Sequence, residues 1–469
     1  MKLTSVLCLA FACFSATYGG PVKNSCSGGD WYIEDDADVK YFYRCWGFRS
    51  GNLDRLRCGK GTCVRPGFGA QDGVAPCTEH CDNLLVPDVT MAPPVGFECN
   101  FENGLCDMTV NADGYYSWRN VSAPASTPGT GTPVDHTTGS GFYLTADADY
   151  AFGSSKTTVA TTPMISVMEP SALEFYYNMY GSKVYELSIW IKHGAVRRKL
   201  WSKTGDQGPG WRYAKIAVPG GLTGGYQIEF EGNTQTTGIT EGDLGLDDIR
   251  LREGEAIDAN DCKDLKAKGS SADGRYKIRL STPDRRVVTV TCYLDMGQTV
   301  IQQRMDGSIS FNRTWAEYKN GFGNYMSFWA GLENIHYWTS RGTYKLSVSL
   351  TDHTDRTYTA EYNDFNVDTE AEKYKLTIGS YAGGDAGDAL LHPQGNLNHN
   401  NMKFSTYDQD NDASSFPCAK QYKSGWWFNY CWAANLNGLW SSGPNCQYTC
   451  AQWKNLGDRT FKKISMSIY

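Results

Sequence analysis

The sequence predicts a multidomain protein that contains a small disulfide-rich module, an all-β sandwich and an α+β domain. The chain has 469 residues, which is too long for a single hydrophobic core. Residues 26–81 hold six cysteines, a density typical of a module stapled by disulfides. From residue 97 onward, short alternating or aromatic runs are separated by Gly, Asp and Thr, which favours antiparallel sheets.

Residues 1–20 have the pattern of a secretory signal. Lys2 is followed by an apolar run over residues 3–14 and then by small residues. The run is too short to span a bilayer, and no later run is long enough, so we expect a secreted, extracellular protein without a transmembrane segment. Cys8 and Cys13 leave with this segment, and an even number of cysteines in an exported protein favours disulfides.

Residues 21–83 form the predicted cysteine-rich module, and the Pro-containing residues 84–94 are the predicted linker. Aromatic residues such as Trp31, Tyr41 and Trp46 lie between the cysteines, where they either pack around disulfides or stack on sugars. The spacing from Asp30 to Phe68 weakly resembles peritrophin-type chitin-binding modules. It departs from them at Val39, where a cysteine is expected, so chitin binding is only an option here.

Residues 95–254 resemble the MAM family. The residues that carry the resemblance are Cys99-Asn100-Phe101-Glu102-Asn103-Gly104-Leu105-Cys106, Trp118, Asp135-His136-Thr137-Thr138-Gly139-Ser140-Gly141, Phe175-Tyr176-Tyr177-Asn178-Met179-Tyr180-Gly181, Trp211 and Leu246-Asp247-Asp248-Ile249. The family implies a jelly-roll sandwich used in adhesion and assembly, with a disulfide between Cys99 and Cys106. Its usual second disulfide is missing. Asp247 and Asp248 either bind a cation or cap loops.

Residues 257–469 resemble the fibrinogen C-terminal domain, as found in ficolins and tachylectins. Among the matching segments are Asp261-Cys262, Cys292-Tyr293-Leu294-Asp295-Met296, Gln303-Arg304-Met305-Asp306-Gly307-Ser308, Phe328-Trp329-Ala330-Gly331-Leu332-Glu333-Asn334-Ile335-His336, Ser405-Thr406-Tyr407-Asp408-Gln409-Asp410-Asn411-Asp412 and Gly425-Trp426-Trp427-Phe428. The family implies an α+β globule with a Cys262–Cys292 disulfide. Gln298 stands where a tryptophan is expected. Residues 311–318 and 368–373 are predicted to be helical.

Three alternating carboxylates, Asp408, Asp410 and Asp412, would repel one another unless a cation lay between them. Ca²⁺ takes such oxygen ligands together with backbone carbonyls. The spacing is not that of an EF-hand, because Ala413 and Ala419 replace its Gly and Glu. The resemblance implies a Ca²⁺ site formed by the side chains of Asp408 and Asp410 with carbonyls near Asp412 and Ser414. The alternative is a solvated acidic turn.

The resemblance also implies an acetyl-group pocket beside this loop. Tyr422 and Tyr448 match two aromatic walls, Trp432 stands where a histidine is usual, and Asn435 is a further candidate for ligand contact. Relatives supply N–H donors through a cis peptide bond, which would here join Cys431 to Trp432. Cys418 is expected to pair with Cys431, and a local Cys446–Cys450 bridge is an option.

These features predict a secreted Ca²⁺-dependent lectin for acetylated sugars of the N-acetylglucosamine type on microbial or chitinous surfaces, serving innate immunity as a homo-oligomer. The alternative is a matrix or adhesion protein that uses the same domains for protein contacts. The net charge of -7 without a Lys/Arg run argues against nucleic acid, and no nucleophile or metalloprotease motif points to an enzyme. Asn120 and Asn312 begin glycosylation sequons.

Overall fold

The computed structural model describes residues 95–112, 116–122, 127–151, 156–234, 241–443, 446 and 448–469, together with the backbone of five N-terminal strands. These strands are β1 (Trp31–Glu34), β2 (Tyr41–Cys45), β3 (Leu53–Arg57), β4 (Cys63–Val64) and β5 (Cys77–Thr78). β1, β2 and β3 form an antiparallel sheet, and β4 pairs with β5. The predicted signal segment, the linker and the pairing of the N-terminal cysteines lie outside the described residues.

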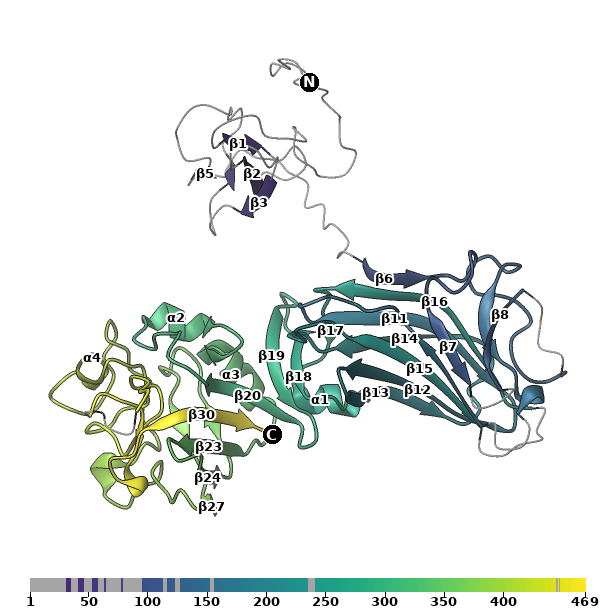
Figure 1. The fold of residues 1–469 in the computed structure, drawn as a ribbon. Coiled ribbons are helices and arrows are strands. Elements are labelled where there is room, and N and C mark those ends of the chain that lie inside the picture. Colours follow the sequence, from purple (N-terminus) through teal and green to yellow (C-terminus); the bar gives the residue numbers. More distant parts are fainter. Residues whose placement is uncertain are drawn as a thin grey trace. The chain divides into compact units, whose positions relative to one another are not determined.

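Two antiparallel sheets form the sandwich that follows (Figure 1). One sheet has the order β14-β11-β16-β9-β8, with β6 also paired to β16; the other has the order β13-β12-β15-β10-β7. The strands of the first are β6 (Val95–Cys99), β8 (Trp118–Val121), β9 (Tyr143–Ala146), β11 (Ser171–Tyr180), β14 (Gly208–Val218) and β16 (Asp243–Glu253). Those of the second are β7 (Thr109–Ala112), β10 (Thr157–Thr161), β12 (Val184–His193), β13 (Val196–Thr204) and β15 (Gln227–Thr234). The predicted all-β sandwich is confirmed.

Alternating burial along the strands explains how the two sheets pack. On β10, Thr158 and Ala160 are fully buried while their neighbours are only half-buried, because successive side chains of a strand point to opposite faces. Phe175 and Phe230, from opposite sheets, meet edge to face in the core with ring centroids 5.9 Å apart. The sandwich is therefore held by strand pairing and by apolar contact.

Asp247 and Asp248 bind the loop that contains His136. The Asp247 carboxylate accepts hydrogen bonds from the N–H groups of His136 and Asp248, both at 2.8 Å. The Asp248 carboxylate lies 2.7 Å from His136 Nδ1, and the His136 ring stacks on Tyr176 at 3.4 Å. This geometry favours the loop-capping interpretation of the two carboxylates.

The C-terminal domain is built around a twisted sheet with the order β17-β18-β19-β20-β30-β23-β24-β27, in which the pairings are antiparallel except for β17 with β18. Its strands are β17 (Ile257–Asp258), β18 (Gly274–Arg279), β19 (Val287–Tyr293), β20 (Gln298–Arg304), β23 (Leu346–Asp352), β24 (Thr357–Tyr362), β27 (Tyr381–Gly383) and β30 (Phe461–Ile468). The last strand, β30, lies in the middle between β20 and β23 (Figure 1). The chain must therefore return from the loop-rich region 384–460 to complete the sheet.

The α-helices of the described part are short: α1 (Cys262–Ala267), α2 (Trp315–Asn320), α3 (Leu332–Thr339) and α4 (Cys418–Tyr422). Of the predicted helix 311–318, only the part after Thr314 forms, because Thr314 and Glu317 make a capping box there. The predicted helix 368–373 is wrong. That segment ends in a turn in which Lys373 and Tyr374 have φ angles of 57° and 48°.

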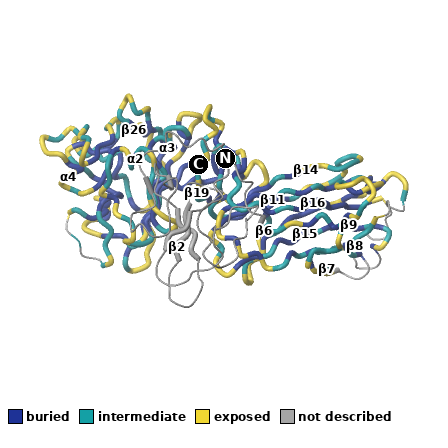
Figure 2. Tube along the Cα trace, turned by 90° about the horizontal axis from the view of Figure 1, so that it is seen from above, coloured by how far each residue is buried: buried dark blue, intermediate teal, exposed yellow. Residues whose placement is uncertain are grey.

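Shorter elements complete the domain: β21 (Phe322–Gly323), β22 (Ser327–Trp329), β25 (Asn366–Val367), β26 (Leu376–Thr377), β28 (Ala434–Asn435) and β29 (Gln452–Trp453). Buried residues follow the strands, and exposed residues lie mainly in the loops (Figure 2). Within the part of the chain that the structure describes, no helix is both long and apolar enough to cross a membrane.

Candidate functional site

Buried aromatic side chains form the framework of the stretch from Tyr407 to Trp453. Trp426, Trp427 and Phe428 are each 0% exposed. Ser405 and Trp426 exchange two backbone hydrogen bonds of 2.9 and 3.1 Å, and the Trp427 indole donates to the carbonyl of Tyr374 at 2.8 Å. Both tryptophans therefore belong to the core. They anchor the loops on either side of them.

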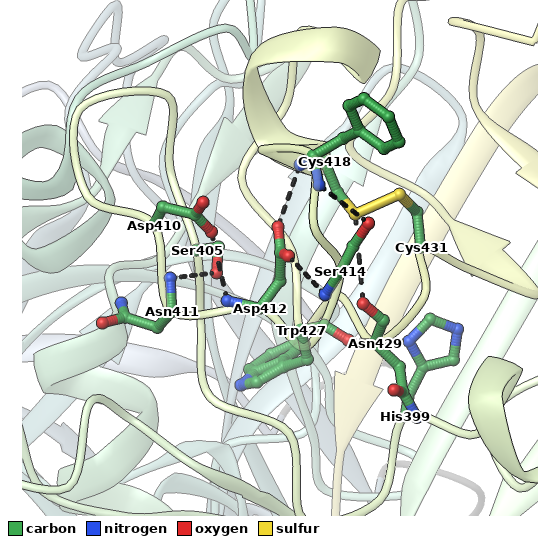
Figure 3. The surroundings of a disulfide bond; sticks show 11 residues. His399, Ser405, Asp410, Asn411, Asp412, Ser414, Cys418, Trp427, Asn429 and Cys431 are labelled. Atoms are coloured by element: carbon green, nitrogen blue, oxygen red, sulfur yellow. Dashed lines mark hydrogen bonds between the residues drawn. A yellow bond between two sulfur atoms is a disulfide. The ribbon is translucent and has the colours of Figure 1, made fainter.

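A disulfide joins the start of α4 to the loop after these tryptophans. Cys418 is bonded to Cys431, and the buried Cys418 begins α4 (Figure 3). The cis peptide bond of the described residues joins Tyr430 to Cys431, one bond before the predicted position between Cys431 and Trp432. The predicted position is therefore wrong by one residue. Cys99–Cys106, Cys262–Cys292 and Cys446–Cys450 are also bonded, as the sequence suggested.

The three carboxylates of the acidic loop have different surroundings. Asp408 Oδ1 accepts from the N–H of Trp315 at 2.9 Å and from the Thr406 hydroxyl at 2.7 Å, so it caps the start of α2. Asp412 accepts from the N–H groups of Ser414 and Cys418, both at 2.9 Å (Figure 3). Asp410 is exposed, accepts the N–H of Asp412 at 3.2 Å, and its carboxyl group also interacts with that of Asp412. Asp410 and Asp412 therefore face one another, while Asp408 binds elsewhere.

The proximity of Asp410 to Asp412 has an electrostatic consequence. Burial, together with the neighbouring Asp410 carboxylate, raises the pKa of Asp412 to about 6, although the N–H groups of Cys418 and Ser414 oppose this shift. A divalent cation between the two carboxylates would relieve their repulsion. Within the described residues no group of three or more His, Cys, Asp or Glu side chains is placed to hold a metal. An ion here would need backbone oxygens as well, which Ca²⁺ accepts.

Of the two predicted aromatic walls, Tyr422 contacts Trp432, which stands where a histidine is usual, and Tyr448 does not. Tyr422 at the end of α4 and Trp432 after the disulfide are half-buried, with ring centroids 5.7 Å apart and nearly perpendicular planes. Tyr422 also faces Phe428 at 6.3 Å. Tyr448 is 72% exposed, and in the described part of the chain no ring contact is found for it. Tyr422 and Trp432 thus form a preformed corner, to which Tyr448 is not joined.

Asn435 belongs to the framework, which corrects the prediction that it contacts a ligand. It is 0% exposed, and its Oδ1 accepts from the Ser424 hydroxyl at 3.1 Å. Asn437 is equally buried and donates to the carbonyl of Gly425 at 2.9 Å. The two asparagines hold the turn against the segment that precedes Trp426, because buried amide groups need hydrogen-bond partners.

His399 is a positioning residue that sequence reasoning missed. Its Nδ1 donates to the carbonyl of Trp427 at 2.8 Å, and both residues are drawn in Figure 3. Its Nε2 accepts from the N–H groups of Ala433 and Ala434 at 3.1 and 3.0 Å. These partners fix a neutral tautomer, and burial lowers the pKa of His399 to about 4. The imidazole therefore ties the backbone directly after Trp432 to the buried tryptophan layer.

Arg304 on β20 supports the backbone of the turn at Leu436 and Gly438. Its guanidinium is buried and donates to the carbonyls of Leu436, at 3.2 Å, and Gly438. Burial lowers the pKa of Arg304 to about 10. Neither His399 nor Arg304 lies in a sequence pattern that signals its role, so only the fold could identify them.

The two sequons have different surroundings. Asn312 is exposed. Asn120 on β8 donates from Nδ2 to the carbonyl of Phe101 at 3.0 Å, so its amide nitrogen is already engaged. Asn312 is the better placed of the two for a glycan.

Comparisons with known proteins agree with this architecture. Residues 258–469 match the family model of the C-terminal globular domain of fibrinogen beta and gamma chains, and residues 99–262 match the model of the MAM domain, meprin/A5/mu. "Fibrinogen-like protein 1" of Bos taurus is 43% identical over 197 residues, which are 39% of this chain and 62% of that protein. The Rattus norvegicus protein of the same name is 41% identical over 215 residues, which are 43% of this chain and 67% of that protein.

Among solved structures, the "Fibrinogen-like globe domain of human ANGPTL6" is 37% identical and covers 46% of this chain and 96% of its own, with a TM-score of 0.42. This chain spans less than two thirds of the length of the bovine relative, 62%, and 67% of the rat relative.

Proposed function

This chain belongs to the fibrinogen-related family, and from that premise we propose that its C-terminal domain is a Ca²⁺-dependent lectin for acetylated sugars. The sugars we propose are of the N-acetylglucosamine type, on microbial or chitinous surfaces. The protein would be secreted and would act in innate immune recognition. The observation that carries the proposal is that the paired carboxylates of Asp410 and Asp412 are tied to the start of α4, the helix whose last residue, Tyr422, forms the corner with Trp432.

Ca²⁺ would be held by the Asp410 and Asp412 side chains with the backbone of Ser414. The sequence suggested Asp408 as a ligand of the ion. In the site proposed here, Asp408 instead ties the acidic loop to α2 through the N–H of Trp315. The ion would neutralise the paired carboxylates and order the loop before Cys418. Asp412 already binds the N–H of Cys418, so order in the acidic loop would be passed on to α4 and the disulfide.

The sugar would bind at Tyr422 and Trp432. A methyl group gains from an apolar aromatic corner, while an amide oxygen needs a backbone N–H donor. Trp432 keeps an indole donor and carries no titratable imidazole. We therefore expect sugar binding to change little between about pH 6.5 and pH 8, since the unperturbed histidine pKa lies near 6.5. One shallow corner binds weakly, so we propose a homo-oligomer whose avidity compensates.

Retention on N-acetylglucosamine resin tests the proposal. We expect the full chain to bind in the presence of Ca²⁺ and to elute with free N-acetylglucosamine or with EDTA. Asp410→Ala should abolish retention while the thermal unfolding of the protein in EDTA, where no ion is bound, stays unchanged. The matched control is Asp458→Ala, because Asp458 is also exposed and lies in the same domain. Normal retention of Asp410→Ala would show that the ion is not part of the site.

The second candidate function is that of a matrix or adhesion protein. It is favoured by the MAM domain, which covers residues 99–262 of the chain. In this case the C-terminal domain would bind a protein. Retention on the resin that neither free sugar nor EDTA releases would support this alternative over the lectin.

A further inference from the structure

A hollow of about 280 Å³ lies on the C-terminal domain, on the sheet formed by β20, β30 and β23. These strands are neighbours within the sheet (Figure 1). Ser347 of β23 faces Ser467 of β30, and Ser349 faces Ser465. All four serines line the hollow. The alternate residues, such as Val348, are fully buried in the core on the other face. Paired hydroxyl groups therefore make up much of the hollow, which Met305 and Ile464 also line.

Small side chains keep this hollow open. Gln298 of β20 lines it and accepts a hydrogen bond from the Ser467 hydroxyl at 3.3 Å. Gln298 stands where the family resemblance leads one to expect a tryptophan. An indole at this position is much larger and would extend over the serines. The combination of a glutamine with four serines leaves room for a small ligand.

The position of the hollow limits what can occupy it. β20, β30 and β23 are internal strands, and the sheet ends at β17 and β27. A peptide cannot add to internal strands, because their backbone groups are already paired. An apolar ligand would leave the hydroxyls without partners, which is costly. A ligand rich in hydroxyl groups fits best, since serine hydroxyls both donate and accept.

Two further side chains narrow the ligand class. Tyr293, which is 37% exposed, lines the hollow and offers a ring for a sugar to stack on. Lys463 lines it as well, opposite Thr351, and the lining contains no Asp or Glu. A volume of about 280 Å³ is at the small end of ligand pockets. We propose that this hollow binds one saccharide ring that carries a carboxylate, such as a hexuronic acid.

This site is independent of the proposed Ca²⁺ site. With no carboxylate in its lining, the hollow does not need a cation to accept an acidic sugar. The acidic loop lies outside the lining residues. Binding should therefore persist in EDTA, and it should persist whether or not the domain recognises acetylated sugars.

Saturation-transfer NMR on the full chain in EDTA, with glucuronic acid and glucose as probes, tests the proposal. We expect saturation transfer to glucuronic acid and a much weaker signal for glucose. Gln298→Trp should fill the hollow and abolish the signal. Lys463→Gln should weaken glucuronic acid binding about tenfold, as expected for the loss of one charge-assisted hydrogen bond. The matched control Thr359→Ala should bind normally, because Thr359 pairs with Ser349 but does not line the hollow.

Thermal unfolding shows whether each variant is folded, and light scattering gives its oligomeric mass. An absent signal in the unmodified protein, an unchanged signal in folded Gln298→Trp, or equal signals for glucose and glucuronic acid would each overturn the proposal. A change in the oligomeric mass of Gln298→Trp without a change in the sugar signal would mean that a second copy of the chain covers the hollow, which also overturns it.

Discussion

The sandwich of residues 95–253 and the loop-rich region around Trp427 are ordered in different ways. Leu246 and Phe230, both fully buried, are typical of the sandwich interior. In the loop-rich region, His399, Asn435 and Asn437 are equally buried, and each is hydrogen-bonded to a neighbouring segment. The sandwich thus depends mainly on apolar contact between paired strands, whereas the loops depend on buried polar groups in addition to their framework of buried aromatic side chains.

This difference has a consequence for function. A loop can expose ligand-binding atoms only where its own backbone is fixed by other groups. His399 and Arg304 supply that support beneath Trp432 and Gly438. The loop-rich region should therefore be sensitive to changes of polarity and charge that conserve volume, whereas the sandwich should be sensitive mainly to changes of volume.

The largest effect is expected for His399→Leu. Leucine fills the space of the imidazole with an apolar side chain. It leaves the carbonyl of Trp427 and the N–H groups of Ala433 and Ala434 without their hydrogen-bond partner. Each unsatisfied buried group costs about 1–3 kcal/mol, so the loss of three partners should lower the free energy of unfolding by roughly 3–9 kcal/mol. Urea unfolding followed by tryptophan fluorescence measures it.

The control for this variant is His392→Leu. His392 is half-buried and accepts one hydrogen bond, from the N–H of Gln394 at 3.2 Å. Its replacement should change stability by only about 1 kcal/mol. Equal urea midpoints for His399→Leu and the unmodified protein would show that the loops do not depend on this imidazole.

The second prediction concerns the pH dependence of the sandwich. Burial, with Asp147 and Asp149 nearby, raises the pKa of Asp243 to about 7, above the unfolded value near 4. The folded state therefore holds this proton more tightly, and the contribution of Asp243 to stability falls as the pH rises from about 4 to about 7. A shift of this size corresponds to about 2–4 kcal/mol.

Calorimetry of the full chain at several pH values measures this effect. Asp243 accepts a hydrogen bond from the N–H of Ala148 at 2.9 Å. Asp243→Asn keeps an oxygen for this hydrogen bond, but its side chain cannot ionise. We expect the unfolding transition of the sandwich to lose its pH dependence in Asp243→Asn. A transition whose pH dependence is the same in both proteins would refute the role of Asp243.

The third prediction is an opposite pH dependence in the loop-rich region. Burial, with a smaller contribution from the charge of His392, lowers the pKa of His399 from about 6.5 to about 4. Its contribution is complete above about pH 6.5 and is lost as the pH falls toward about 4, because the unfolded state then binds the extra proton. The expected loss is about 3 kcal/mol.

Retention on N-acetylglucosamine resin should fall over the same pH range as the stability of this region. His399→Gln, which does not titrate, should remove the slope in calorimetry. A slope that survives in this variant would assign the acid sensitivity to another group.

Apolar and cysteine patterns predicted much of this structure, while buried polar roles escaped prediction. Alternating runs predicted the sandwich, and the even number of cysteines in a chain expected to be exported predicted disulfides. Asn435 was misjudged because an Asn-Leu-Asn-Gly segment has the composition of an exposed turn, although tertiary contacts bury it. Helix α3 was missed because Gly331 at its N-cap offers no capping side chain.

The acidic loop is a second case in which the sequence did not reveal the roles of polar side chains. Its alternating spacing marked all three carboxylates as possible ligands, and nothing in the spacing could tell that Asp408 binds Trp315, which is distant in sequence. Long-range hydrogen bonds decide which member of a polar cluster is free for a ligand. The sequence pattern could therefore indicate the cluster but not the role of each member.

The smallest effect is expected at the glycosylation sequons. Asn312 is exposed, so a glycan there should leave stability within about 0.5 kcal/mol of that of Asn312→Gln. Asn120 donates a hydrogen bond to the carbonyl of Phe101 in the sandwich. We therefore expect no glycan on Asn120, and Asn120→Gln should lower the free energy of unfolding by about 1 kcal/mol. Mass spectrometry of the protein, with and without glycan removal, measures the occupancy of each site. A glycan found on Asn120 would mean that the sequon is modified before the sandwich closes around it.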